Sequence, residues 1–304
     1  MIIKPIVVQV VLDKPLAQGF DYLWDAEKLG GLPQIGQLVE IPFAKSKAVG
    51  VVIKVSDHSA YEIEKLKSVD RIAPLPPLDS ALLGLMNFAS HYYVHSLGET
   101  TLPAIPQMWK KPDYWEKIPE KLASADKKSK NKSDVVAEGL ITLGQLNPDQ
   151  KNALEALLAN GKKENQFRAI LLQGQTGSGK TAVFLNWLAS VLRDDKAQIL
   201  LLVPEINLTP QLERRVRAYF PDKTMSVLHS GISEKKRGIA WLEAMTGKAQ
   251  IILGTRLAAL TPLPNLRAIV VDEEHDSSYK QQDGTRYSAR DLAIWRAHDQ
   301  KIPI

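Results

Sequence analysis

The residues best suited to chemistry form a glycine-rich run, Gly174-Gln175-Thr176-Gly177-Ser178-Gly179-Lys180-Thr181. The run fits the phosphate-loop pattern GxxxxGK(S/T) at every fixed position. Its glycines permit positive φ angles, so successive backbone N–H groups can turn inward around phosphate oxygens. Lys180 can then reach the β- and γ-phosphates of a nucleotide, and the Thr181 hydroxyl can ligate its Mg²⁺. The run therefore predicts an ATP-binding site.

A second chemical cluster lies further along the chain, Asp272-Glu273-Glu274-His275. It directly follows an apolar run, 268–271, which favours a strand buried on both faces of a parallel sheet. Because the carboxyl ends of such strands gather ligand-binding groups, Asp272 can hold the Mg²⁺ of a nucleotide and Glu273 can activate the attacking water. Alone, these residues are typical of a solvated loop. Paired with the phosphate loop, they predict an ATPase.

Apolar strands that alternate with helices supply the framework for both clusters. The expected strands are 169–172, 199–203, 226–228, 251–253 and 268–271. Helices are expected between them, including 182–192 directly after the phosphate loop and 209–220, which has an apolar face. This alternation predicts an α/β domain over 145–304 with a parallel sheet covered on both faces.

The beginning of the chain predicts a small β-rich domain over 1–105. Its strand candidates are 6–12, 37–42 and 49–55, and a helix is expected over 79–93 with Asp79 or Ser80 near its N-cap. Prolines then interrupt 106–144, and 121–133 is rich in lysine and serine. This composition favours a disordered basic tether, with a specific DNA-binding arm as the alternative.

Composition limits the class of protein. The chain has 304 residues, 44% of them apolar and 24% charged, as is ordinary for a soluble protein of two domains. It has no cysteine, which excludes disulfides and thiolate zinc sites within it. No apolar run approaches the roughly 20 residues that cross a bilayer, and no signal-peptide layout is present, so we expect a cytoplasmic protein without membrane contact. The net charge of +5 is compatible with a nucleic-acid partner.

Several motifs resemble those of superfamily 2 helicases. These are Leu146-Asn147-Pro148-Asp149-Gln150, Val203-Pro204-Glu205-Ile206 with Thr209, Gly254-Thr255-Arg256 and the DExH form Asp272-Glu273-Glu274-His275. The resemblance implies a RecA-like first motor lobe in which Gln150 reads adenine. It also implies that Thr209, Thr255 and Arg256 grip the phosphate backbone of single-stranded DNA, and that His275 links the ATP site to DNA.

Further residues resemble the primosomal replication-restart helicases within that superfamily. One set is Ser278-Tyr279-Lys280-Gln281 with Arg286-Tyr287-Ser288-Ala289-Arg290-Asp291, which is similar to the aromatic-rich loop of that family. There the tyrosines Tyr279 and Tyr287 can stack on bases while Lys280 and Arg286 meet phosphates. The other set is Gly19-Phe20-Asp21-Tyr22, Val39-Glu40-Ile41-Pro42-Phe43, Gly50-Val51-Val52 and His91-Tyr92-Tyr93 with Gly98-Glu99, which is similar to the family's 3′-end-binding domain.

The resemblance implies that Phe20, Asp21 and Tyr22 hold a 3′ terminus, although Phe20 by itself is also typical of a core residue. It implies an ATP-dependent 3′→5′ DNA helicase that uses ATP and Mg²⁺, recognises stalled forks and initiates primosome assembly. Its partners would be forked and single-stranded DNA, primosome proteins and the single-stranded DNA-binding protein. Another superfamily 2 translocase and a non-catalytic DNA-binding adaptor are the alternatives.

The chain also departs from that family. The interval 106–144 is too short and too rich in lysine for the family's winged helix, and the chain ends at Ile304, before the expected position of motif III. The family's second lobe, arginine finger and zinc-binding cysteines would follow that position. We therefore expect this N-terminal part to bind DNA and nucleotide but not to unwind DNA alone, since an arginine finger contributes about 10³–10⁵ in rate.

Overall fold

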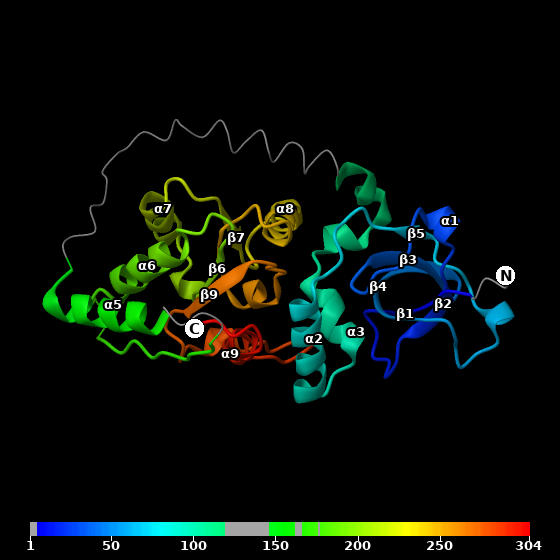
Figure 1. Ribbon diagram of the computed structural model, residues 1–304, viewed down its shortest axis with the longest axis horizontal. Coiled ribbons are helices and arrows are strands. Elements are labelled where there is room, and N and C mark those ends of the chain that lie inside the picture. The colour runs from blue at the N-terminus through cyan, green and yellow to red at the C-terminus, as the bar shows by residue number, and fades with distance from the viewer. Residues whose placement is uncertain (1–4, 119–145, 162–165, 176) are drawn as a thin grey trace. The chain divides into compact units, whose positions relative to one another are not determined.

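The computed structural model describes residues 5–118, 146–161, 166–175 and 177–304. The chain divides into two compact units, Met1–Ala125 and Asp126–Ile304. The predicted tether 121–133 and Thr176 of the phosphate loop lie outside the described residues. Figure 1 shows the antiparallel sheet and short helices of the first unit and the strands and helices of the second.

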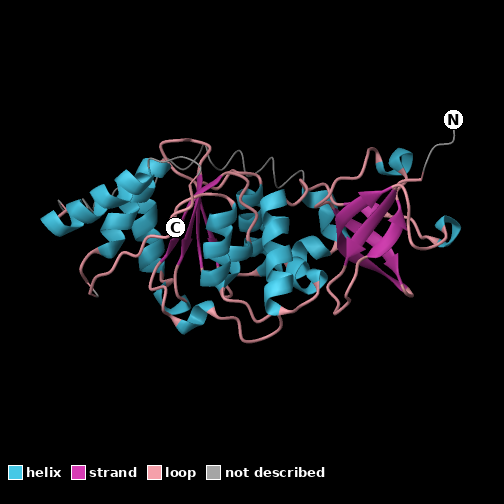
Figure 2. Ribbon diagram, turned by 60° about the horizontal axis from the view of Figure 1, so that its bottom comes forward, coloured by secondary structure: helices cyan, strands magenta, loops and turns pink. Residues whose placement is uncertain are grey.

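The first unit is built on a five-stranded antiparallel sheet with the order β2-β1-β4-β3-β5. Its strands are β1 Val7–Val11, β2 Phe20–Leu23, β3 Leu38–Phe43, β4 Ser46–Ser56 and β5 Arg71–Ile72. The sheet is the isolated group of magenta strands in Figure 2. The predicted strands correspond to β1, β3 and β4, of which β1 and β4 are rich in valine. β2 and β5 are too short to carry a pattern of their own and are defined by pairing with β1 and β3.

Helices complete this unit. They are α1 Ala26–Leu29, α2 Ser80–Tyr93 and α3 Leu97–Thr101. The Asp79 side chain accepts a hydrogen bond from the backbone N–H of Leu82 at 2.7 Å, so the predicted N-cap of α2 is confirmed. α3 begins with a capping box between Ser96 and Glu99. A Cβ atom at Gly98 would overlap the carbonyl oxygen of Leu12, so glycine lets this helix lie directly against the chain that leaves β1.

The proline-interrupted segment that follows is ordered further than the sequence predicts. Two short 3₁₀ helices, Gln107–Lys110 and Pro112–Lys117, lie where the tether was expected to begin. Trp109 and Trp115 are fully buried, and the Trp115 indole N–H donates to the carbonyl of Trp109 at 2.9 Å. Proline stops an α-helix but is tolerated in the first turn of a helix, and two buried indoles anchor the segment to the unit.

The second unit has a parallel four-stranded sheet with the order β7-β8-β6-β9. The strands are β6 Gln198–Leu202, β7 Met225–Leu228, β8 Ile251–Gly254 and β9 Leu266–Val271. The helices are α5 Pro148–Gly161, α6 Lys180–Val191, α7 Pro210–Tyr219, α8 Glu234–Met245 and α9 Ala289–Asp299. Four of the five strands and the helices after the phosphate loop and after Thr209 are confirmed. None of the described helices combines the length and apolarity needed to span a bilayer.

Side chains alternate along β6 between two packed faces. Ile199 and Leu201 share a hydrophobic core with residues of α5, α6 and α7. Leu200 and Leu202 are also fully buried but lie outside that core, so they point to the opposite face. α8 packs against β7 and α9 packs against β9. The predicted RecA-like α/β fold, with helices on both faces of a parallel sheet, is therefore confirmed (Figure 1).

The fifth predicted strand, 169–172, is wrong as a ladder strand. The residue before it, Arg168, makes an isolated parallel bridge with Pro303. The Ile170 N–H donates to the carbonyl of Ile304 at 2.8 Å, and the Ile269 N–H of β9 donates to the carbonyl of Pro303 at 3.1 Å. The residues 303–304 therefore lie between β9 and the segment that leads into the phosphate loop. Pairing stops there, and Leu171 beyond it is 74% exposed.

Candidate functional site

The phosphate loop leads directly into α6. Gly177 and Gly179 both have φ of 84°, the left-handed conformation that side chains disfavour. Gly179 is the N-cap of α6 and supplies no side-chain cap, which leaves the start of the helix suited to an anion. Within the loop, the Ser178 N–H donates to the carbonyl of Gln175 at 3.1 Å. This geometry fits a nucleotide phosphate.

Lys180 joins the phosphate loop to the acidic cluster. Its Nζ donates to the carbonyl of Gly174 at 2.8 Å and lies 3.3 Å from Oε1 of Glu273. Residues predicted from two distant motifs therefore meet around one ammonium group. Thr181 is the next residue of α6 and is half-buried.

Asp272 follows the last residue of β9, and its N–H donates to the carbonyl of Leu202 in β6 at 2.9 Å. Burial raises the pKa of Asp272, and the charge of Glu273 raises it further, against the opposing effects of a backbone hydrogen bond from Glu273 and of the Lys180 charge. A bound divalent cation would stabilise the charged carboxylate and so offset both effects, which is why this carboxyl fits the predicted Mg²⁺. Glu273 itself has φ of 46°, uncommon for a residue other than glycine.

Gln150 and His275 flank this centre. The Gln150 side-chain amide donates to the carbonyl of Ser178 at 2.8 Å, and a Cβ atom at Gly179 would overlap that amide. Asn147 and Gln150 also exchange two hydrogen bonds at the start of α5. His275 is largely exposed, with Nε2 3.8 Å from Oε2 of Glu273. Within the described residues, no three His, Asp or Glu side chains are arranged as a metal site by themselves.

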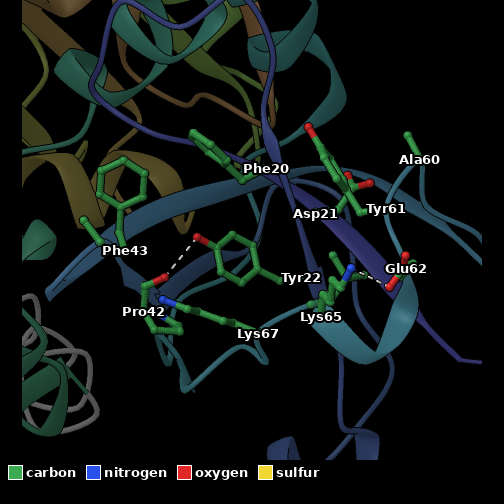
Figure 3. Close-up of a pocket in the computed structure, with 12 residues that line it drawn as sticks. Phe20, Asp21, Tyr22, Pro42, Phe43, Ala60, Tyr61, Glu62, Lys65 and Lys67 are labelled. Atoms are coloured by element: carbon green, nitrogen blue, oxygen red, sulfur yellow. Dashed lines mark hydrogen bonds and ion pairs between the residues drawn. The ribbon is translucent and has the colours of Figure 1, made fainter.

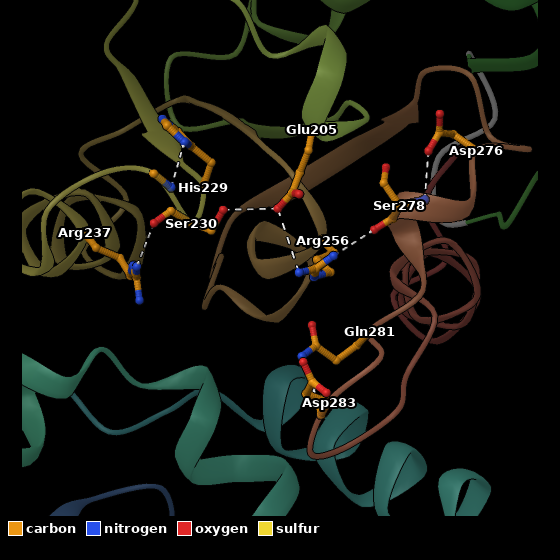
Figure 4. A network of polar contacts seen from close by, with 10 residues as sticks. Glu205, His229, Ser230, Arg237, Arg256, Asp276, Ser278, Gln281 and Asp283 are labelled. Carbon is orange, nitrogen blue, oxygen red and sulfur yellow. Dashed lines mark hydrogen bonds and ion pairs between the residues drawn. The ribbon is translucent and has the colours of Figure 1, made fainter.

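A second polar network lies beyond the carboxyl ends of β6, β7 and β8 (Figure 4). Arg256 Nη1 donates to the carbonyl of Ser278 at 3.2 Å, and Nη2 lies 3.8 Å from Oε1 of Glu205. The Ser230 hydroxyl donates to the same Glu205 oxygen at 3.1 Å. Glu205 and Ser230 were not among the predicted site residues, although Glu205 belongs to a motif that resembles those of superfamily 2 helicases.

Two predicted DNA-contacting threonines have different environments. Thr209 is exposed and caps α7, where its hydroxyl accepts from the Leu212 N–H at 3.2 Å. Thr255 is 2% exposed, so its side chain is not presented to a ligand. Its position at the end of β8 serves instead to bring Arg256 to the sheet edge.

The prediction that Tyr279 and Tyr287 stack on bases does not hold in this arrangement. The two residues are only 2% and 6% exposed. The Tyr279 hydroxyl donates to the carbonyl of Asp272 at 2.6 Å, and burial raises the pKa of both phenols. Rings of this size stabilise a core more than a solvated loop. Lys280 and Arg286 remain exposed between them, on a segment closed by a bridge between Lys280 and Ser288.

The first unit carries a pocket of about 540 Å³ beside β2 and β3 (Figure 3). Phe20 is 37% exposed in its wall, so the alternative that it is a core residue is wrong. Its ring meets that of Phe43 edge-on at 5.3 Å. Tyr22 is buried, donates to the carbonyl of Pro42 at 3.1 Å, and has its pKa raised by burial to about 12.

Asp21 is the fixed acid of this pocket. Its Oδ2 accepts from the Ser59 hydroxyl at 2.6 Å, and its Oδ1 accepts from the Gln9 amide at 3.4 Å. Lys65 and Lys67 also line the pocket. Glu62 lines the pocket as well and pairs with Lys65 at 2.7 Å. An exposed ring, a fixed acceptor and the basic side chain of Lys67 together suit the end of a nucleic-acid strand.

Comparison with known proteins matches both units. Residues 9–106 match the 3′DNA-binding domain (3′BD), and residues 147–302 match the DEAD/DEAH box helicase family. Replication restart protein PriA of Haemophilus influenzae is 33% identical over 357 residues, which cover 98% of this chain and 48% of that protein. PriA of Treponema pallidum is 30% identical over 302 residues, with 98% and 43% covered.

PriA of Synechocystis is 44% identical over 161 residues, which cover 53% of this chain and 19% of that protein. The chain thus spans about half the length, or less, of these curated relatives. The match to the Haemophilus protein is longer than this chain of 304 residues, so that relative has additional residues within the matched region.

The raised pKa of Asp272 predicts a pH-dependent stability effect. A carboxyl whose pKa is raised in the folded protein stabilises the fold while it is protonated. This contribution is fully present below the ordinary pKa of about 3.9, and it is lost as the pH rises through the pKa of the folded state. Asp272→Asn should therefore raise the melting temperature at pH 7, and the gain should shrink as pH falls toward 4. Thermal unfolding between pH 4 and 8 measures it.

Asp276→Asn is the matched control, because the Ser278 side chain and backbone N–H lower the pKa of Asp276. Its carboxylate stabilises the fold above its ordinary pKa, so this variant should not gain stability at pH 7. An Asp272→Asn protein that melts at or below the wild-type temperature at pH 7 would contradict the inference that folding raises the pKa of Asp272.

Proposed function

The chain belongs to the DEAD/DEAH box helicase family, and on this premise we propose that it is the DNA- and nucleotide-binding part of an ATP-dependent DNA helicase of replication restart. One observation carries the proposal. Lys180 of the phosphate loop lies against Glu273 of the acidic motif, at the start of α6 and the end of β9. This contact brings the residue suited to nucleotide phosphates next to the residue suited to activating water, which supports phosphoryl transfer to water at this place.

We propose the following roles around the nucleotide. Lys180 exchanges the Gly174 carbonyl and Glu273 for the β- and γ-phosphates, while Gln150 contacts adenine. Thr181 and Asp272 hold the Mg²⁺, which neutralises phosphate charge when bound. Glu273 is then released to orient and deprotonate the attacking water.

Single-stranded DNA would lie along the carboxyl edge of the second sheet. Arg256, exposed Lys280 and exposed Arg286 supply positive charge for backbone phosphates, and Thr209 adds a hydroxyl at the start of α7. His275 lies beside Glu273 and is exposed, which suits a link between the ATP site and DNA. Contacts of this kind grip phosphates without reading sequence.

The pocket of the first unit would hold the 3′ end of a strand. Phe20 offers its exposed ring to the terminal base, and Asp21 accepts from a sugar hydroxyl or a base edge. Tyr22 supports the pocket without lying open to the ligand, because its buried ring and its hydrogen bond to the carbonyl of Pro42 hold β2 against β3. The match of this unit to the 3′DNA-binding domain supports this role.

The curated relatives are named replication restart proteins, which supports a cytoplasmic role at stalled forks. We propose that the whole protein unwinds DNA in the 3′→5′ direction and initiates primosome assembly there. The alternative of a DNA-binding adaptor with an inert nucleotide fold is separated by the variant described next.

Lys180→Ala tests the nucleotide site. Because it removes charge-assisted hydrogen bonds of about 1.5–3 kcal/mol, binding of a fluorescent ATP analogue in Mg²⁺ should weaken roughly ten- to hundredfold. Binding of single-stranded DNA should stay near the wild-type value. Lys196→Ala, which removes an exposed lysine before β6, is the control for net charge. Unchanged nucleotide binding by Lys180→Ala would refute the site.

Phe20→Ala tests the 3′-end pocket. Stacking on an aromatic ring contributes about 1–3 kcal/mol per base, so affinity for a linear oligonucleotide with a 3′ hydroxyl should fall about five- to hundredfold. Affinity for a circular single strand, which offers no 3′ end, should not change. Leu32→Ala removes an exposed apolar side chain of the same unit outside the pocket and serves as control. Equal losses on both DNAs would argue against 3′-end recognition.

A further inference from the structure

Arg256 is held by a carboxylate of the chain itself. Its Nη2 lies 3.8 Å from Oε1 of Glu205. Four other arginine–carboxylate contacts among the described residues are shorter, between 2.7 and 3.0 Å. The pair is also open to solvent, with side-chain exposures of 25% for Arg256 and 39% for Glu205. An ion pair that is long and solvated contributes little to stability and is easily exchanged.

Each member of the pair has a second partner that does not depend on the other. Arg256 donates through Nη1 to the backbone carbonyl of Ser278, which fixes the guanidinium at the sheet edge. Glu205 accepts from the hydroxyl of Ser230. When the ion pair opens, both side chains therefore retain a hydrogen bond, and the Nη2 edge of Arg256 is available for another anion.

We propose that Glu205 is a displaceable counter-ion, which occupies Arg256 until a backbone phosphate of single-stranded DNA replaces it. The inference rests on the proposed DNA-binding role of this edge and adds a residue that the motif comparison did not assign. Arginine presents several N–H donors in a planar fork that suits phosphate oxygens. The Glu205 carboxylate beside that phosphate is a like charge, so it opposes DNA until it turns away.

Glu205→Gln tests the exchange, because the amide keeps an acceptor for Ser230 while the charge is lost. We expect affinity for a labelled circular single-stranded oligonucleotide, measured by fluorescence anisotropy at low salt with residues 1–304, to increase about two- to fivefold. Glu205→Ala should change affinity in the same direction. The circular strand removes any contribution from 3′-end binding by the first unit.

Asp195→Asn is the matched control. Asp195 also pairs with a basic side chain, Lys223 at 2.8 Å. Because Asp195 precedes β6, it lies at the amino ends of the strands, opposite to Arg256. It makes the same change in net charge, and its effect on DNA affinity should be smaller than that of Glu205→Gln. Arg256→Ala should reduce DNA affinity more in the Glu205→Gln background than in the wild-type protein. Without the Glu205 charge, Arg256 contacts the phosphate with no competing partner, so its removal loses the whole of that contact.

The outcomes separate the two proposals. If the wild-type chain does not bind the circular strand, the DNA-binding role of this edge fails and the exchange fails with it. If the wild-type chain binds, but Glu205→Gln has unchanged or weaker affinity or matches Asp195→Asn, only the exchange is overturned. Equal costs of Arg256→Ala in both backgrounds would overturn it as well.

Discussion

The candidate nucleotide site of the second unit centres on one ammonium group, that of Lys180. Burial at the end of β9 raises the pKa of Asp272, and the neighbouring carboxylate of Glu273 raises it further. Lys180 offsets part of that cost from a helix that begins immediately after the phosphate loop. The same contact joins the loop to the acids. The roles proposed for Lys180, Asp272 and Glu273 follow from this placement.

Strand register explains why distant motifs meet at one edge. Leu202 of β6 pairs with Gly254 of β8 and with Val271 of β9, so these strands reach the same level. The residues that follow, Glu205, Arg256 and Asp272, therefore leave the sheet side by side. Parallel strands gather ligand-binding groups in this way because their carboxyl ends coincide. The same alignment therefore places both the groups proposed to contact DNA and those proposed to contact the nucleotide.

Local patterns in the sequence predicted most of this framework. The apolar runs of β6 to β9, the cap at Asp79 and the glycines of the phosphate loop depend on neighbouring residues, so they could be recognised directly. The strand predicted over 169–172 was wrong. The pairing of this segment depends on residues 303–304, which are far away in the sequence, so its local apolar pattern could not reveal it. Tyr279 and Tyr287 were assigned to DNA from family resemblance, whereas tertiary packing buries them. The burial of Trp109 and Trp115 was not predicted, because the prolines around them indicate a segment without regular structure.

A crystal structure of the chain with Mg²⁺ and a non-hydrolysable ATP analogue tests the central claim most directly. We expect Lys180 Nζ to leave the carbonyl of Gly174 and the carboxylate of Glu273 for the β- and γ-phosphates, with Asp272 at the metal. A nucleotide bound elsewhere, with the contacts of Lys180 to Gly174 and Glu273 unchanged at 2.8 and 3.3 Å, would contradict the claim.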